Sequence, residues 1–303
     1  MQFAIADAPY EIVRLVATLP DHVIICLPIL LFCSETMRIS ITALLVCLTS
    51  VITACSTPPE VADQPDMAIV WVRDAAEYRA VSLQAYRAAT LALPGMIADT
   101  SWSALPDQKD AHDLPPAVIF DVDETALTNP HFQQSFEAPF TDKKLNDWSI
   151  QHNATPVPGV TDFVTLARRS GVKIFFATNR PCVASTDTND PCPQKSVVIQ
   201  DLIEAGLPAN ESNVSLSGEQ EHWGKEKKIR RDWIGEKYRV IMLFGDDLSD
   251  FIPCVRQRNV APCSAEPATK SSREALLEQY DTYWGAGWYV LPNPMHGSWT
   301  SFR

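Results

Sequence analysis

The chain has 303 residues, of which 46% are hydrophobic and 20% are charged, so it is long enough for one domain with a sizeable core. Its formal net charge is −12 and no basic stripe runs along it, which argues against a nucleic-acid-binding protein. An acidic chain that handles an anionic substrate must gather positive charge locally, from a metal ion or from a few Lys and Arg side chains.

Residues 1–55 are typical of an export segment. A short basic start at Met37 is followed by an apolar run over residues 39–51 and by small residues that lead to Cys55. The pattern resembles the lipobox of bacterial lipoproteins, which implies that Cys55 is lipidated and anchors an outer-membrane protein of a Gram-negative bacterium, facing the periplasm or the exterior. We take Met37 as the expected start and residues 1–36 as an upstream extension. The alternative is an ordinary cleaved signal with an incidental cysteine.

Residues 56–66 are polar and proline-rich and predict a tether, which leaves residues 67–303 for the folded domain. The stretch from Asp66 to Leu93 has no Gly or Pro, and its apolar residues recur at spacings of three and four. This pattern predicts an amphipathic helix with a purely structural, core-facing stripe. The expected stripe comprises Trp71, Ala75, Tyr78, Val81, Ala85 and Ala88.

The apolar run of residues 117–120 follows two prolines and ends in Asp121-Val122-Asp123, which predicts a buried central strand. Because side chains alternate along an extended chain, Asp121 and Asp123 can project toward one side. Two carboxylates so close together repel and favour a bound cation, and their oxygens suit Mg²⁺. Solvated loop acids or a helix N-cap would be the simpler explanation of this motif alone.

Residues 126–158 show little periodicity and follow the acidic motif directly. A long insertion at this place usually builds one wall of a site. Phe132, Phe136 and Trp148 could form a stacking wall, although each of them alone is more typical of packing.

Further apolar runs alternate with amphipathic stretches toward the C-terminus. The expected strands cover residues 172–176, 214–216, 240–244 and 288–291, and the expected helices cover 161–170, 194–205, 225–236 and 271–283. This alternation predicts an α/β fold with a doubly wound parallel sheet and a small helical and loop addition.

Polar clusters follow three of these strands. They are the Asp-x-Asp motif, Thr178-Asn179-Arg180, and Gly245-Asp246-Asp247 with Asp250. Ligands of open α/β sheets bind at the carboxyl ends of the strands, so the three clusters should converge on one crevice. The predicted helix of residues 225–236 would add local positive charge.

Four cysteines remain in the exported part of the chain, an even number that favours disulfides. Two of them bracket one polar loop and two bracket another, so we predict the pairs Cys182–Cys192 and Cys254–Cys263 among three formal pairings. A zinc site is the alternative, but no C-x-x-C spacing supports it.

Taken together, the motifs resemble those of the class C acid phosphatases, a group of outer-membrane lipoproteins within subfamily IIIB of the haloacid dehalogenase (HAD) superfamily. The resemblance is carried by Asp-Val-Asp-Glu-Thr at 121–125, Phe-Ala-Thr-Asn-Arg at 176–180, Gly-Asp-Asp-Leu-Ser-Asp-Phe at 245–251 and Leu-Pro-Asn-Pro-Met-His-Gly-Ser-Trp at 291–299. It covers nearly the whole mature chain and implies a HAD-like Rossmannoid sheet.

The resemblance implies a role for each acidic motif residue. Asp121 would be the nucleophile, and Asp123 the general acid and base. Mg²⁺ would be bound by Asp121, by the backbone carbonyl of Asp123 and by Asp246. Asp247 or Asp250 would orient a metal-bound water or support the metal ligands.

The phosphoryl oxygens would contact the polar cluster and one lysine. Thr178 would supply its hydroxyl, and Asn179 belongs to the same cluster. Lys227 is the better lysine because it stands three residues before Arg230, as in the family pattern, and Lys225 is the alternative. For the other basic residues of this predicted helix, a solvated face is the expected role.

Two positions depart from the family pattern. Asp247 replaces the usual Asn, which adds negative charge near the metal and could tighten metal binding or require a protonated carboxyl. His296 stands where an aromatic residue is frequent, so base stacking at this position is in doubt. His296 could instead donate to a phosphate or a ribose, or be an ordinary loop histidine.

The implied activity is Mg²⁺-dependent hydrolysis of phosphomonoesters through an aspartyl-phosphate, with 5′-nucleotides as a narrower substrate class. Because Asp123 must be protonated to serve the leaving group, we expect an acidic optimum. The alternative is a catalytically inactive surface lipoprotein on the same fold. A homodimer is a further option that the resemblance raises.

Overall fold

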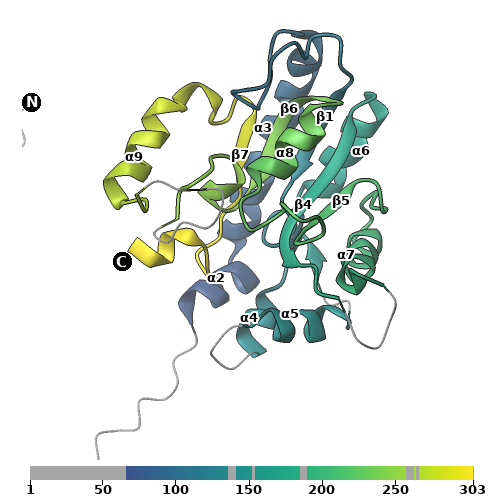
Figure 1. Ribbon diagram of the computed structural model, residues 1–303. Helices are drawn as coiled ribbons and strands as arrows, with labels where there is room; N and C mark the ends of the chain where they lie inside the picture. Colours follow the sequence, from purple (N-terminus) through teal and green to yellow (C-terminus); the bar gives the residue numbers. More distant parts are fainter. Residues whose placement is uncertain are drawn as a thin grey trace, which may run out of the picture. The chain divides into compact units, whose positions relative to one another are not determined.

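Five apolar runs form the central sheet, in which all strands pair in parallel in the order β5-β4-β1-β6-β7 (Figure 1). The strands are β1 (Pro116–Phe120), β4 (Lys173–Pro181), β5 (Val214–Ser217), β6 (Arg239–Gly245) and β7 (Trp288–Val290). The first strand lies in the centre, as the acidic motif predicts. The predicted α/β fold with a parallel sheet is confirmed.

The computed structural model describes residues 66–135, 141–151, 154–184, 190–256, 263 and 266–302. These belong to one compact unit that comprises residues 63–303. The predicted export segment, Cys55 and Phe136 lie outside the described residues. Within the described ranges, no helix is long and apolar enough to cross a membrane.

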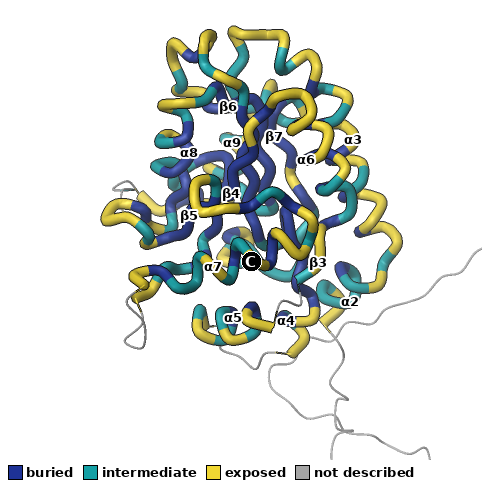
Figure 2. The backbone as a smooth tube through the Cα atoms, turned by 90° about the vertical axis from the view of Figure 1, so that its right-hand side faces the viewer, coloured by how far each residue is buried: buried dark blue, intermediate teal, exposed yellow. Residues whose placement is uncertain are grey.

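Helices cover both faces of the sheet, and two separate cores result. The main helices are α2 (Met67–Asp74), α3 (Ala76–Ala98), α6 (Val160–Arg169), α7 (Pro193–Glu204), α8 (Lys228–Gly235) and α9 (Lys270–Gln279). Because β1 side chains alternate, Val118 and Phe120 pack in the core that α3 and α6 share, whereas Ile119 packs with Ile234 of α8. Figure 2 shows the buried strands enclosed by helices with exposed outer faces.

The predicted first helix is divided. Ala75 has an extended backbone, with φ −78° and ψ 132°, and separates α2 from α3. The predicted end at Leu93 is also wrong, because α3 continues through Pro94 to Ala98.

The predicted core-facing stripe of this helix is partly wrong. Val81 and Ala88 are exposed, and the buried face comprises Tyr78, Ser82, Tyr86, Ala89 and Leu93. A polarity pattern misses this face because Ser82 lies on it. Its hydroxyl donates to the Tyr78 carbonyl at 2.8 Å, which allows a polar side chain to be buried.

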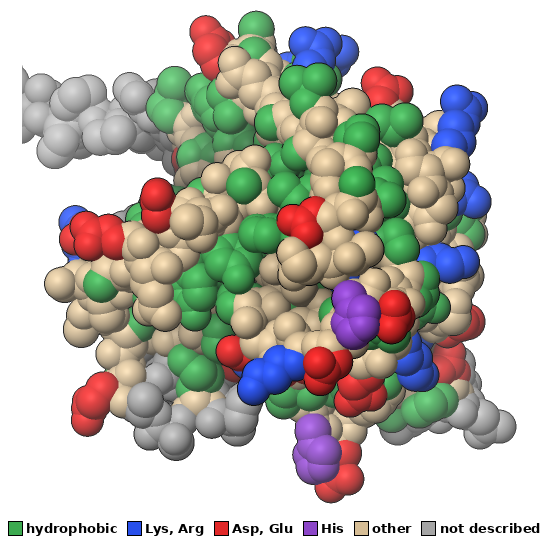
Figure 3. Space-filling model, turned by 90° about the horizontal axis from the view of Figure 1, so that it is seen from above, with side chains coloured by type: hydrophobic (Ala, Val, Ile, Leu, Met, Phe, Trp, Pro, Cys, Tyr) green, Lys and Arg blue, Asp and Glu red, His purple; other side chains and the backbone are tan. Residues whose placement is uncertain are grey.

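The insertion after β1 folds into four short elements. They are β2 (Leu127–Thr128), α4 (Pro130–Ser135), α5 (Asp142–Ser149) and β3 (Thr155–Pro156), and β2 pairs with β3 in antiparallel fashion. In Figure 1, α4 and α5 lie beyond the carboxyl ends of the strands. Three 3₁₀ segments complete the unit, η1 (Leu248–Asp250), η2 (Asp281–Tyr283) and η3 (Ser298–Phe302). On the opposite end of the unit, acidic and basic side chains are interspersed (Figure 3).

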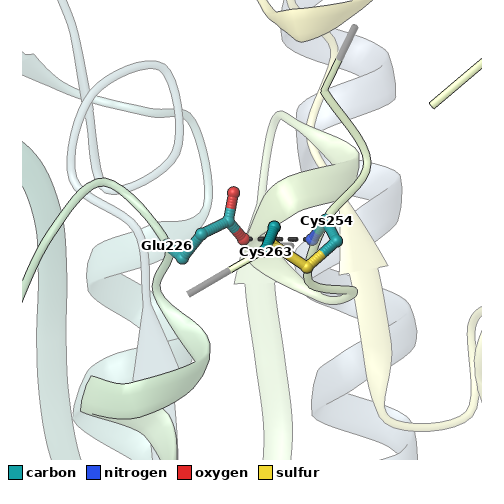
Figure 4. Close-up of side chains that lie close together, drawn as sticks. All are labelled: Glu226, Cys254 and Cys263. Atoms are coloured by element: carbon teal, nitrogen blue, oxygen red, sulfur yellow. Dashed lines mark hydrogen bonds between the residues drawn. A yellow bond between two sulfur atoms is a disulfide. The ribbon is translucent and has the colours of Figure 1, made fainter. Parts of the chain in front are cut away.

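Both predicted disulfides, Cys182–Cys192 and Cys254–Cys263, are present. Glu226 lies beside the second disulfide and accepts a hydrogen bond of 3.1 Å from the Cys254 N–H (Figure 4). These three residues resemble a metal-ligand group. Because both sulfurs are covalently paired, they are not thiolate ligands here, and the zinc alternative is not supported.

The buried face of α3 gives a direct stability prediction. Leu93→Ala removes a side chain that is 1% exposed and should lower the free energy of unfolding by about 2–5 kcal/mol. Leu91→Ala, on the same helix but 84% exposed, should change it by no more than about 0.5 kcal/mol. Denaturant unfolding followed by far-UV circular dichroism measures both. Equal losses for the two variants would contradict this packing of α3.

Candidate active site

The three predicted clusters converge on one cavity of about 670 Å³ at the carboxyl ends of β1, β4 and β6. Asp121 follows β1, Asp246 follows β6, and Thr178 to Arg180 form the last part of β4. Among the residues singled out from the sequence, those of the three clusters and of the basic segment line this cavity: Asp121, Asp123, Thr178, Asn179, Arg180, Lys225, Lys227, Asp246, Asp247 and Asp250. A second cleft, of about 850 Å³, opens at the amino ends of β4 and β5 and is lined by none of these residues.

Asp121, Asp246 and Asp250 bring one carboxylate oxygen each to within 4.8 Å of the others. Burial is the main cause that raises the pKa of Asp121 to about 7, against the lowering effect of Lys227. Burial and then the charge of Asp121 raise the pKa of Asp246 well above its ordinary value. Buried carboxylates that repel in this way, with only oxygen donors, fit a hard divalent cation. Asp250, expected in a supporting role, belongs to this group.

Lys227 lies directly between the acidic residues. Its ammonium donates to the Asp121 carboxylate and, at 2.6 Å, to Asp250, and its side chain is only 5% exposed. Lys225 lies on the cavity wall, where it donates to the Asn179 carbonyl at 3.2 Å. The structure therefore brings Lys227, and not Lys225, to the expected nucleophile.

The basic helix differs from the prediction in two ways. It begins at Lys228, so Lys227 occupies its N-cap instead of its side. Arg230 and Arg231 are buried, which contradicts the expected solvated face. Arg230 donates to the Thr178 carbonyl and, at 2.6 Å, to Asn179 Oδ1, whereas Arg231 donates to the Asp250 carbonyl at 2.7 Å. Arg230 thus holds the end of β4 and Arg231 holds the segment after β6, and a helix pattern alone cannot reveal these contacts.

Thr178 is buried beside Asp123, and its hydroxyl oxygen lies 3.5 Å from Asp123 Oδ2. The same hydroxyl accepts the Arg180 N–H at 3.0 Å. Asn179 lines the cavity, but its side-chain oxygen is already held by Arg230. Both residues lie where the sequence predicts, at the end of β4.

Asp123 has a partner that the sequence analysis does not assign. Arg180 donates to both Asp123 oxygens, with Nε distances of 3.2 and 3.0 Å and an Nη2 distance of 2.8 Å. Burial raises the pKa of Asp123, but Arg180, together with His296 and Lys227, lowers it, so that the pKa lies below its ordinary value. The only sequence signal for this contact is the position of Arg180 directly after Thr178-Asn179 at a strand end.

Asp247 points toward the C-terminal segment. Its carboxylate accepts the Ser249 N–H at 2.9 Å, the Ser298 hydroxyl at 2.9 Å and the Ser298 N–H. Burial raises the pKa of Asp247, but these hydrogen bonds together hold it below its ordinary value. Of the two options for Asp247, these contacts favour an ionised carboxylate over a protonated carboxyl.

Two of the remaining candidates, Phe132 and His296, line the cavity. Trp148 does not line it, and packs against Phe132 with ring centroids 5.5 Å apart. The ring of His296 lies 3.2 Å from the amide nitrogen of Asn293. Burial lowers the pKa of His296. The insertion and the C-terminal segment thus enclose the site from two sides.

Comparison with known proteins agrees with this geometry. A family model described as "HAD superfamily, subfamily IIIB (Acid phosphatase)" matches residues 37–299. The class C acid phosphatase from Bacillus anthracis with tungstate bound is 25% identical, with a TM-score of 0.60 over 79% of this chain and 87% of that one. Another structure of the Bacillus anthracis enzyme is 24% identical, with a TM-score of 0.60 over 78% and 86%.

The contacts of Asp247 predict a graded loss of stability. Asp247→Ala removes the acceptors of Ser298 and Ser249, so it should lower the free energy of unfolding by about 1.5–3 kcal/mol. Asp247→Asn keeps one acceptor oxygen and should lose less. Denaturant unfolding of both variants checks the order. A larger loss for Asn than for Ala would contradict the anchoring of the C-terminal segment by this carboxylate.

Proposed function

Because the chain belongs to the acid phosphatases of subfamily IIIB of the HAD superfamily, we propose that it hydrolyses phosphomonoesters through an aspartyl-phosphate intermediate, with Mg²⁺ as the cofactor. Its membership of this family identifies it as a phosphomonoester hydrolase. The observation that carries the proposed mechanism is the position of Asp121, which is buried beside Lys227 and grouped with Asp246 and Asp250.

Asp121 is the nucleophile of the proposed reaction. Its carboxylate attacks phosphorus, the bond from phosphorus to the ester oxygen breaks, and an aspartyl-phosphate and an alcohol result. Asp123 gives a proton to the departing oxygen. Water then attacks the aspartyl-phosphate, Asp123 takes up the proton, and phosphate leaves with Asp121 restored.

The donor set of the cavity fits Mg²⁺. The carboxylates of Asp121, Asp246 and Asp250 would hold the ion, and we expect the backbone carbonyl of Asp123 to join them, as the family resemblance implies. When bound, the ion neutralises negative charge on the transferring phosphoryl group. Lys227 adds positive charge at the nucleophile, and the Thr178 hydroxyl and Asn179 complete the polar wall for the phosphoryl oxygens.

The substrate class that fits best is a small monoester. The lining of the cavity combines the charged groups with the apolar side chains of Phe132, Leu145 and Met295 and with His296. Such a wall suits an aryl group or a nucleobase. Nucleoside 5′-monophosphates are therefore the narrower candidate, which a substrate panel separates from general monoesters.

We propose that the enzyme is attached to the outer membrane through lipidated Cys55. The support is the signal-like order of basic start, apolar run and cysteine from Met37 onward. The range matched by the family model also begins at residue 37. A homodimer is compatible with this arrangement, and a binding-only lipoprotein is the alternative that absence of turnover would favour.

Phosphate release by the purified full-length protein tests the mechanism. At mildly acidic pH, Mg²⁺ should support turnover of 4-nitrophenyl phosphate or of 5′-nucleotides, and a chelator should abolish it. Asp121→Asn should reduce turnover by at least about a thousandfold because it removes the nucleophile. Asp147→Asn, which changes an exposed acid on α5 that does not line the cavity, is the matched control and should retain most activity. Chelator-resistant turnover, or an active Asp121→Asn enzyme, would refute the proposal.

The metal site has a readout that does not require turnover. Mg²⁺ should raise the midpoint of thermal unfolding because it relieves repulsion among the buried carboxylates. Asp246→Asn should remove most of this shift, whereas Asp147→Asn should keep it. Differential scanning fluorimetry with increasing Mg²⁺ measures the effect. An equal shift in the Asp246→Asn protein would exclude this residue as a ligand.

A further inference from the structure

The orientation of the Asp123 carboxylate is fixed by hydrogen bonds to both of its oxygens. Arg180 donates to both of its oxygens through Nε and, at 2.8 Å, to Oδ1 through Nη2. Asn129 Nδ2 donates to the same Oδ1 at 3.0 Å. The direction of this carboxyl in the cavity is therefore fixed mainly by one guanidinium.

Arg180 is in turn fixed from behind. Its third nitrogen, Nη1, donates to Asp201 Oδ2 on α7 at 2.9 Å, and both of these side chains are 1% exposed. A planar guanidinium bound by carboxylates on two sides cannot turn without breaking a charged hydrogen bond. Asp201 thus connects α7 to Asp123 through Arg180.

The backbone supports the same connection. The Arg180 N–H donates to the Thr178 hydroxyl at 3.0 Å. Two residues beyond Arg180, Cys182 forms the disulfide with Cys192, which immediately precedes α7. The disulfide therefore ties the end of β4 to the helix that carries Asp201.

We propose that Arg180 and Asp201 are positioning residues that aim the Asp123 carboxyl at the oxygen of the leaving group. This inference rests on the proposed function, in which Asp123 protonates that oxygen. A role of Arg180 in binding the substrate phosphoryl group is less compatible with the structure. Its three side-chain nitrogens already donate to carboxylates, and its side chain is buried.

Misalignment of a general acid has a specific kinetic signature. A nitrophenolate is a stable anion and leaves with little help from a proton, whereas an alkoxide needs one. If the Asp123 carboxyl no longer points at the leaving-group oxygen, the hydrolysis of alkyl phosphates should therefore slow more than that of nitrophenyl phosphates. A defect in phosphate binding, metal binding or folding would slow both alike.

The experiment compares kcat/KM for glycerol phosphate and for 4-nitrophenyl phosphate in the purified full-length protein with Mg²⁺. Arg180→Lys keeps the charge but cannot bind both oxygens of Asp123 in the same way, so the alkyl-to-aryl ratio should fall by about tenfold or more. Asp201→Ala should lower the ratio in the same direction. Asp201→Asn keeps an acceptor for Nη1 and should restore most of it.

Arg239→Lys is the matched control. Arg239 is also buried, but it donates to backbone carbonyls of residues 96–102 at the end of α3 and beyond. Its substitution should leave the ratio unchanged, whatever its effect on stability. The ratio does not depend on the fraction of folded enzyme, so partly unfolded variants remain informative. If Arg180→Lys cannot be produced as soluble protein, Asp201→Ala alone tests the inference.

Equal losses for the two substrates in Arg180→Lys and Asp201→Ala would overturn the positioning role. A wild-type enzyme that hydrolyses neither substrate, or an Asp121→Asn enzyme that remains active, would instead overturn the proposed function on which the inference rests. A selective loss of alkyl phosphate hydrolysis in both variants, with the ratio intact in Arg239→Lys, supports the positioning role.

Discussion

Negative charge is concentrated at the carboxyl ends of β1 and β6, and the rest of the site depends on how that charge is balanced. Asp121, Asp246 and Asp250 are drawn together because they follow neighbouring parallel strands. Lys227 supplies one positive charge among them. Burial and mutual repulsion still raise the pKa of Asp121 and Asp246, so the arrangement favours a divalent cation. A chain with a net charge of −12 thus places a buried lysine locally among the acidic residues of its cavity.

Three buried arginines give this site its shape. Arg230 holds the last part of β4, Arg231 holds the segment after β6, and Arg180 holds Asp123. Each uses several donors of its planar guanidinium on carbonyl or carboxylate oxygens, which a lysine could not match. The segments that bear the candidate catalytic residues are therefore fixed by side chains that need not contact the substrate.

The sheet and the convergence of the polar clusters could be predicted because both follow from local patterns. Buried strands appear as short apolar runs, and the carboxyl ends of parallel strands share one edge. The buried face of α3, the start of α8 and the contacts of Arg180 could not be predicted. They depend on partners far away in the chain, such as Asp201 for Arg180 and the main-chain oxygens for Arg230. The periodicity of apolar residues carries no information about such pairs, so the sequence predicts a solvated face for Arg230 and Arg231, which are buried.

Asp247 shows how a changed residue can be accommodated without altering the group of Asp121, Asp246 and Asp250. An asparagine, usual here in the family that the sequence resembles, offers one acceptor oxygen, whereas the Asp247 carboxylate accepts from Ser249 and twice from Ser298. The negative charge of Asp247 is stabilised by hydrogen bonds that also fix the C-terminal segment, so the ionised form is favoured. Because Met295 and His296 of that segment line the cavity, Asp247 helps to fix the shape of the cavity wall. Acidic residues that are adjacent in sequence therefore divide their roles according to the donors that surround them.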